Sequence, residues 1–255
     1  MKLSLSKTIV ILLLLLVMQV CACTYTPWHR DQAEMFLNKG IYFIEMRQFN
    51  SALKELLEAD KASPYDHRIH YFLGMAYHGK GMKDKAIEEF KQAISIKNDY
   101  SEAHNYLGTL YSDMGLWDQA IEEFDRALVN VIYDTPAMPL YNAGWAYYSK
   151  KDYKTALIKY QEALQKEPTT NLRPQIEKNI GLIYFDQNNI QEAIDHFKKA
   201  VALNSALYDA QFLLGESYLK IKDNVNAKKA FQAVLKLAPE SSVGQKAKSY
   251  LQSIN

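Results

Sequence analysis

Residues 67–100 read HRIHYFLGMAYHGKGMKDKAIEEFKQAISIKNDY, and the order of small and aromatic residues in this stretch decides the fold. Five residues carry that order: Gly74, Tyr77, Ala86, Phe90 and Ala93. Residues 101–134 follow directly and place Gly, Tyr, Ala, Phe and Ala at the same five offsets. Because identical offsets recur in adjacent stretches, the sequence contains an internal repeat of 34 residues.

The same pattern occurs six times along the chain. The glycines lie 34 to 37 residues apart, at Gly40, Gly74, Gly108, Gly144, Gly181 and Gly215. Three positions after each glycine is an aromatic residue: Phe43, Tyr77, Tyr111, Tyr147, Tyr184 and Tyr218. Sixteen positions after each glycine is a large apolar residue: Leu56, Phe90, Phe124, Tyr160, Phe197 and Phe231. Agreement at so many offsets indicates six copies of one structural unit.

Each unit has the residues that a pair of closely packed helices requires. Glycine and alanine let two antiparallel helices approach, and we expect the aromatic residues to fill the space between one repeat and the next. Over residues 33–241 the pattern resembles the tetratricopeptide repeat (TPR). The resemblance implies an all-α fold, a right-handed TPR superhelix (α-solenoid) of six helix-turn-helix repeats. Their boundaries are expected at residues 33–66, 67–100, 101–134, 137–170, 174–207 and 208–241.

Residues 242–255 follow the last repeat and are expected to form a C-terminal capping helix. Their apolar residues share one helical face, as a helix with one buried side requires. These residues are Val243, Ala247, Tyr250, Leu251 and Ile254. A repeat array needs such a cap because its last repeat has no neighbour to cover it.

The first 22 residues have the features of a signal peptide. Lys2 and Lys7 precede an apolar run, Ile9 to Met18, that is too short to span a bilayer. The following Val20-Cys21-Ala22-Cys23 resembles the lipobox of bacterial lipoproteins. This resemblance implies a lipoprotein signal peptide over residues 1–22, cleavage after Ala22 and acylation of Cys23. Residues 23–32 would then be the lipidated cysteine and a short tether.

Two alternatives remain for this segment. If Cys21 were the acylated residue, Val20 would occupy the position where the signal peptidase needs a small side chain, so we favour Cys23. The segment could also remain uncleaved as an N-terminal anchor helix. By resemblance to enteric lipoproteins, Thr24 rather than aspartate after Cys23 favours the outer membrane, with the protein facing the periplasm.

The sequence shows no pattern typical of an active site. His67 and His70 are not joined by a carboxylate or cysteine at helical spacing, so we interpret His70 as a core residue. The acidic pairs Glu88-Glu89 and Glu122-Glu123 are expected on solvated helix faces. A formal net charge of +1 gives no basic face for nucleic acid. We therefore expect a protein that is not an enzyme and that uses no cofactor, metal or nucleic acid.

The first helix of each repeat is expected to line the inner surface of the array. Its inward positions lie three residues before, one after and four after the glycine, and most carry apolar or aromatic side chains. Such a surface favours an amphipathic helix or an extended apolar peptide, with aromatic anchors. The alternative is that some of these side chains pack against the neighbouring first helix. The expected partner-binding residues are Leu37, Ile41, Tyr71, Met75, Asn105, Thr109, Tyr141, Trp145, Tyr148, Leu182, Phe185 and Phe212.

The order of these parts resembles that of the type IV pilus pilotins (Tgl/PilF/PilW family). A lipobox is followed by nine residues from Thr24 to Gln32, six repeats and a capping helix. The segment Ala127–Tyr147, which contains Tyr133-Asp134-Thr135-Pro136, resembles that family's lengthened junction. The resemblance implies binding of the secretin subunit and promotion of its outer-membrane insertion and multimerisation. The alternative is an envelope adaptor that recruits peptidoglycan hydrolases or synthases.

Overall fold

The structure is a computed structural model that describes residues 27–130 and 132–254. Within these ranges the chain forms thirteen α-helices and no strand. None of the helices in the described ranges is long and apolar enough to cross a bilayer. The predicted signal peptide (residues 1–22) and Cys23 lie outside the described residues, so both stay predictions.

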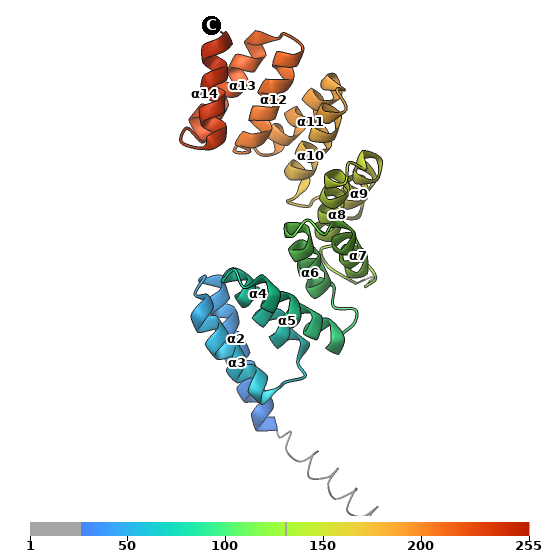
Figure 1. Ribbon diagram of the computed structural model, residues 1–255, viewed down its shortest axis with the longest axis vertical. Helices are drawn as coiled ribbons and strands as arrows, with labels where there is room; N and C mark the ends of the chain where they lie inside the picture. Colours follow the sequence, from blue (N-terminus) through green and yellow to red (C-terminus); the bar gives the residue numbers. More distant parts are fainter. Residues whose placement is uncertain (1–26, 131, 255) are drawn as a thin grey trace, which may run out of the picture. The chain divides into compact units, whose positions relative to one another are not determined.

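The helices follow one another as six pairs and a single last helix (Figure 1). Their bounds are α2 (Pro27–Glu45), α3 (Phe49–Ala62), α4 (His67–Gly79), α5 (Lys83–Ile96), α6 (Ser101–Asp113), α7 (Trp117–Ala127), α8 (Ala137–Ser149), α9 (Tyr153–Lys166), α10 (Arg173–Asp186), α11 (Ile190–Leu203), α12 (Tyr208–Lys220), α13 (Asn224–Leu237) and α14 (Ser242–Ile254). This arrangement confirms the expected TPR α-solenoid of six helix-turn-helix repeats with a C-terminal helix.

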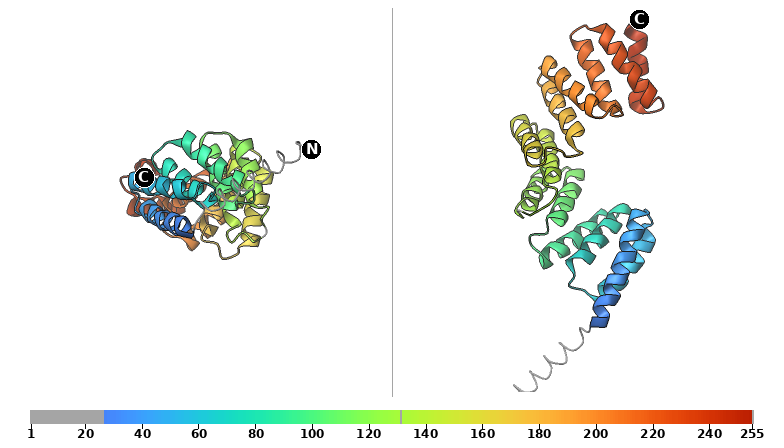
Figure 2. Two further views of the ribbon diagram at one scale, coloured as in Figure 1. Left: turned by 90° about the horizontal axis from the view of Figure 1, so that it is seen from below. Right: turned by 180° about the vertical axis from the view of Figure 1, so that it is seen from behind.

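Contacts within the chain divide it into an N-terminal unit (Met1–Ala103) and a C-terminal unit (His104–Asn255). In the N-terminal unit, α2 packs along α3, α4 packs along α5, and α4 also packs against α3. The views in Figure 2 likewise show α2 and α3 side by side. One cluster of the core of this unit lies between α2, α3 and α4 and contains Leu37, Ala52, Leu53, Leu56, Ala59, Ile69, Leu73 and Ala76.

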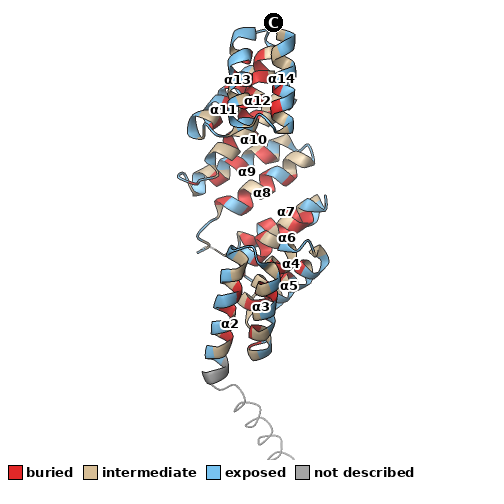
Figure 3. Ribbon diagram, turned by 90° about the vertical axis from the view of Figure 1, so that its left-hand side faces the viewer, coloured by how far each residue is buried: buried red, intermediate tan, exposed pale blue. Residues whose placement is uncertain are grey.

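The C-terminal unit stacks its helix pairs in sequence order and ends at α14. Each of the pairs α8–α9, α10–α11 and α12–α13 packs closely, and α14 packs against α13. Buried residues line the seams between neighbouring helices, while the outward sides of the helices are exposed (Figure 3). Tyr250 of α14 stacks on Phe231 with 4.9 Å between the ring centroids. The last helix therefore covers the final repeat, as a capping helix must.

The repeat glycines lie where a large side chain of the second helix crosses the first helix. A β-carbon added to Gly144 would be 2.6 Å from the Tyr160 ring, and one added to Gly74 would be 2.8 Å from the Phe90 ring. The other four glycines have the same relation to the residue sixteen positions later. The expectation that the aromatic residues fill the space between repeats is therefore incomplete: these rings also pack within their own repeat, while the Phe231 ring still reaches Tyr250 of the last helix.

Candidate protein-binding face

Two aromatic side chains, Trp145 and Tyr148, form a cluster on α8, the first helix of the fourth repeat. Trp145 is 40% exposed, although it lies in the middle of a helix whose other face is buried. Its ring stacks on Tyr148 with 5.1 Å between centroids and 28° between planes. An exposed tryptophan supported by a second ring offers a large rigid contact surface at little cost in conformational entropy. The predicted anchor position of Trp145 is thus accessible to a partner.

Tyr148 is held in place from the next repeat. Its hydroxyl donates a hydrogen bond of 2.7 Å to Asp186 Oδ2 at the end of α10. The pKa of Tyr148 is raised, mainly because the phenol is partly buried and also because it donates this hydrogen bond to a carboxylate, so the hydroxyl keeps its proton. The aromatic cluster is therefore fixed before any partner arrives, and binding need not order it.

A small polar hollow lies beside Trp145. Its volume is about 130 Å³, and its lining residues are Thr109, Ser112, Asp113, Phe124, Asn142 and Trp145. Asn142 Nδ2 donates to Asn105 Oδ1 at 3.0 Å, which joins α8 to α6. The hydroxyl of Ser112 is buried and makes no hydrogen bond within the described residues. The face therefore combines an aromatic anchor with groups that can hydrogen-bond.

The remaining predicted residues of this unit lie further along the same set of helices. Leu182 and Phe185 on α10 are half-buried, and the ammonium group of Lys220 lies 4.3 Å from the centre of the Phe185 ring. Lys178 Nζ forms an ion pair of 2.7 Å with Asp209 on α12. A cation placed over an aromatic face and a paired lysine make this end of the face less apolar than the Trp145 end.

In the N-terminal unit, the predicted residues on α2 and α4 are half-buried except for Leu37. Tyr71 packs edge-on against the Phe90 ring at 5.8 Å and lies 5.3 Å from the Tyr100 ring. Ile41 and Met75 are both half-buried. Ile41 packs against the core of the unit. These residues offer partial contact area to a partner, with less exposure than Trp145.

Burial corrects three of the expected partner-binding residues. Leu37 is 1% exposed, and Asn105 and Phe212 are also buried, so they stabilise the repeats and have little surface for a partner. All three occupy the position three residues before the glycine. At that position Phe212, like Tyr71 and Tyr141, contacts the large ring sixteen residues after the glycine. The positions one and four residues after the glycine remain at least partly accessible in every repeat.

The structure also corrects the interpretation of the acidic pairs. Glu88 and Glu122 are exposed as expected, but Glu89 Oε2 lies 2.8 Å from His70 Nδ1. The same arrangement joins His104 to Glu123 at 2.6 Å and, with the residue types exchanged, Glu177 to His196 at 2.7 Å. Each pair ties the first helix of a repeat to the second, and His70 is buried, as predicted for a core residue.

The histidine–glutamate pairs show no arrangement that would hold a metal ion. Among the described residues, no group of three or more His, Cys, Asp or Glu side chains converges on one point. The pairs could have been found in the sequence. In each pair one residue lies four positions before the repeat glycine and the other fifteen positions after it. Their geometry supports a structural role within the repeat.

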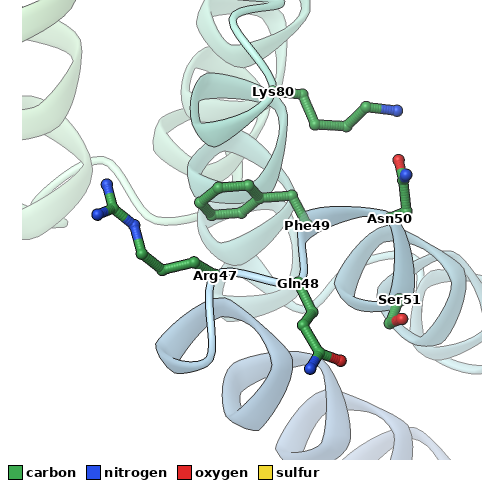
Figure 4. Close-up of a pocket in the computed structure, with 6 residues that line it drawn as sticks. All are labelled: Arg47, Gln48, Phe49, Asn50, Ser51 and Lys80. Atoms are coloured by element: carbon green, nitrogen blue, oxygen red, sulfur yellow. The ribbon is translucent and has the colours of Figure 1, made fainter.

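A second hollow of about 420 Å³ lies at the turn between α2 and α3, and the sequence patterns gave no reason to expect it. Figure 4 shows Arg47 and Lys80 extending in different directions, with the Phe49 ring between their attachment points. The ring covers Gly79, where an added β-carbon would lie 2.3 Å from it. Since the two cations do not converge, the hollow presents no single point at which an anion would meet both.

Comparisons with known proteins agree with this fold. Sequence models of the tetratricopeptide repeat match residues 67–100, 99–166 and 209–241, and a TPR repeat model matches residues 181–222. Human tetratricopeptide repeat protein 13 is 28% identical over 192 residues, which are 73% of this chain. The chain spans 21% of the length of that relative.

Two solved structures are similar over almost their full lengths. PilF of Pseudomonas aeruginosa has a TM-score of 0.75 at 14% identity, covering 87% of this chain and 99% of PilF. PilW, a widely conserved type IV pilus biogenesis factor, has a TM-score of 0.77 at 21% identity, covering 85% of this chain and 98% of PilW. At these identities the likeness establishes the shared fold.

Proposed function

Because this chain belongs to the tetratricopeptide repeat proteins, we propose that it is a non-catalytic scaffold that binds another protein through the first helices of its repeats. The observation that carries the proposal is the exposed Trp145, which stacks on a Tyr148 already fixed by Asp186. Aromatic anchors of this kind dominate the energy of protein interfaces. The neighbouring polar hollow adds hydrogen-bonding groups that restrict which segments fit.

The proposed setting is type IV pilus biogenesis. The likeness to PilF and PilW, which supports this proposal, covers 87% and 85% of this chain and 99% and 98% of those proteins. In this proposal the protein is a pilotin that binds the outer-membrane secretin subunit and promotes its insertion and multimerisation. Acylated Cys23 would hold the protein on the periplasmic face of the outer membrane. An amphipathic secretin segment bound to the Trp145 face would be shielded from aggregation before assembly.

The test compares two substitutions in one repeat. Trp145→Asp places a charge on the proposed face, while Ile158→Asp places one on α9 at a residue of similar exposure, 42% against 40%. In cells that carry the secretin, Trp145→Asp is expected to reduce secretin multimers on immunoblots several-fold. Ile158→Asp is expected to leave them unchanged. Full multimer levels from a folded, abundant Trp145→Asp protein would remove this face from the mechanism.

A crosslinking experiment separates the pilotin from the adaptor. A photoreactive residue in place of Trp145 would form an adduct with the protein that occupies the face in cells. A secretin adduct is expected. An adduct dominated by a peptidoglycan hydrolase or synthase would instead favour the envelope adaptor, and the same residue in place of Ile158 provides the background.

A further inference from the structure

The first helix that the structure describes, α2, exposes a side that the first helices of the later repeats bury. In repeats two to six, the positions five residues before, one before and two after the glycine are buried. In α4 these residues are Ile69, Leu73 and Ala76, which form a continuous core with α3 of the preceding repeat. These positions are therefore the ones that a first helix turns toward the repeat before it.

In α2 the same three positions are Met35, Lys39 and Tyr42, and we name them the end face. Met35 is 46% exposed and Tyr42 is 54% exposed, and Lys39 is also exposed. A hollow of about 560 Å³ opens beside them, lined by Asn38, Lys39, Tyr42, Phe43 and Glu55. A terminal repeat that faces only water normally has a polar outer side. The end face instead has two large apolar side chains around one cation.

The mature chain is too short at this end to cover the face itself. At the other end of the array, covering the last repeat takes the thirteen residues of α14. With processing at Cys23, as proposed above, only four residues precede Pro27, the first residue of α2. Four residues cannot form a helix of comparable length, so they cannot supply a second capping helix of the α14 kind.

We propose that the end face lies against the lipid bilayer that holds the acylated Cys23, an inference that rests on the proposed anchoring. Four extended residues span at most about 14 Å, and the eight residue-to-residue steps along α2 from Pro27 to Met35 add about 12 Å. The end face therefore starts within about 26 Å of the anchor.

The composition of the end face suits the membrane surface. Tyrosine is enriched at the headgroup level of membranes. Lysine can lay its aliphatic stem on the apolar layer and keep its ammonium among anionic headgroups. Because the anchor keeps the local lipid concentration high, this small face needs only weak affinity of its own. Contact with the bilayer would fix the orientation of the N-terminal unit relative to the membrane.

Site-directed spin labelling of the acylated full chain tests this contact. After processing, an introduced cysteine is the sole free thiol, because the sequence contains only Cys21 and Cys23. Tyr42→Cys reports on the end face, and Glu88→Cys on the exposed side of α5 is the control. In vesicles of phosphatidylethanolamine and phosphatidylglycerol, the label at position 42 is expected to show a several-fold higher ratio of oxygen to nickel-chelate collisions than the label at position 88.

Three other outcomes would overturn the proposal, and they differ from one another. Equal, water-like ratios at both positions in protein of acylated mass would mean that the end face does not touch lipid. Spin–spin broadening at position 42 that disappears on dilution with unlabelled protein would identify a second copy as the occupant. A mass without acyl chains would refute the anchoring itself, whatever the result for the Trp145 face.

Discussion

The repeat glycine, which has no side chain, sets the distance between the two helices of each repeat. At Gly144 the edge of the Tyr160 ring occupies the space that a β-carbon would need, and Tyr160 is fully buried. Its hydroxyl accepts a hydrogen bond of 3.1 Å from Asn179 Nδ2 of the next repeat. One tyrosine thus joins the two helices of its own repeat and also reaches the following one. The contact of the glycine with a large side chain is therefore an energetic unit that recurs in all six repeats, with Leu56 in the first repeat and a ring in the other five.

Gly144→Ala is expected to destabilise the protein even though alanine is the better helix former. The gain in helix propensity is about 1 kcal/mol. Forcing a β-carbon against the buried Tyr160 ring costs about 1–3 kcal/mol or more, because the ring has no empty space to enter. Denaturant unfolding measures the balance, with the exposed Lys154→Ala on α9 as the control. A Gly144→Ala protein more stable than the wild type would show that the ring moves aside at low cost.

His70 has a geometry that requires its charged form. Nδ1 lies 2.8 Å from Glu89 Oε2 and Nε2 lies 3.1 Å from the Pro64 carbonyl oxygen. Both partners only accept, so both ring nitrogens must carry a proton. The hydrogen bond to Glu89 raises the pKa of His70 against the opposing effect of burial, and the Pro64 bond and the nearby Asp60 raise it further. A raised folded-state pKa stabilises the protein while the histidine is protonated.

The contribution of His70 should therefore depend on pH with a defined sign. It is fully present below the unfolded-state pKa of about 6.5 and is lost as the pH rises through the higher folded-state pKa. The stability lead of the wild type over His70→Gln is therefore expected to be larger at pH 6 than at pH 9. Unfolding curves at both values measure this, since the pairs of His104 and His196 are common to both proteins. A lead that grows with pH would contradict the assignment.

At the scale of the helices, the sequence predicted the fold well because the two helices of each repeat are neighbours in the sequence and pack against each other. The offsets from Gly74 to Phe90 describe a local helix pair, and periodicity alone was sufficient to find it. Burial at the position three before the glycine was not predictable. It depends on contacts between helices that the repeat offsets do not encode: Phe212 and Tyr71 each meet a phenylalanine ring, yet Phe212 is buried and Tyr71 is half-buried. The exposure of Trp145 followed from its position one residue after the glycine, which is partly accessible in every repeat.

The last helix offers a prediction at this scale. Tyr250 joins α14 to the final repeat by stacking on Phe231 and by donating a hydrogen bond of 3.1 Å to Glu216. Repeat arrays lose stability locally when a terminal contact is removed. Tyr250→Ala is expected to cost about 3 kcal/mol in the final repeat, with faster amide exchange in α13 and α14. Amide exchange in α8 and α9 is expected to stay unchanged. Uniformly faster amide exchange along the whole chain would instead indicate that the array unfolds as one cooperative unit.

For the whole molecule, the two units divide the proposed roles. The N-terminal unit contains the end face and follows the predicted anchor, while the C-terminal unit contains the exposed Trp145 with its polar hollow. Stacked repeats can supply both faces because their helices offer side chains at regular spacing along the array. The proposed membrane attachment and the proposed partner binding can thus be altered separately by substitution, so the anchor can be tested without disturbing the Trp145 face.

Cys23→Ala is expected to abolish acylation and to release the protein from the outer membrane into soluble fractions. The physical reason is that acyl chains supply the attachment, at about 0.8 kcal/mol for each buried methylene, so a multi-chain anchor is effectively permanent. Palmitate labelling followed by membrane fractionation measures both effects. Cys21→Ala is the matched control and should leave labelling and location unchanged. If Cys21→Ala abolished the labelling instead, Cys21 would be the acylated residue. If neither substitution altered the location of the protein, neither cysteine would be responsible for membrane attachment. In the second case, binding by the Trp145 face would have to be tested at the cellular location where the protein is then found.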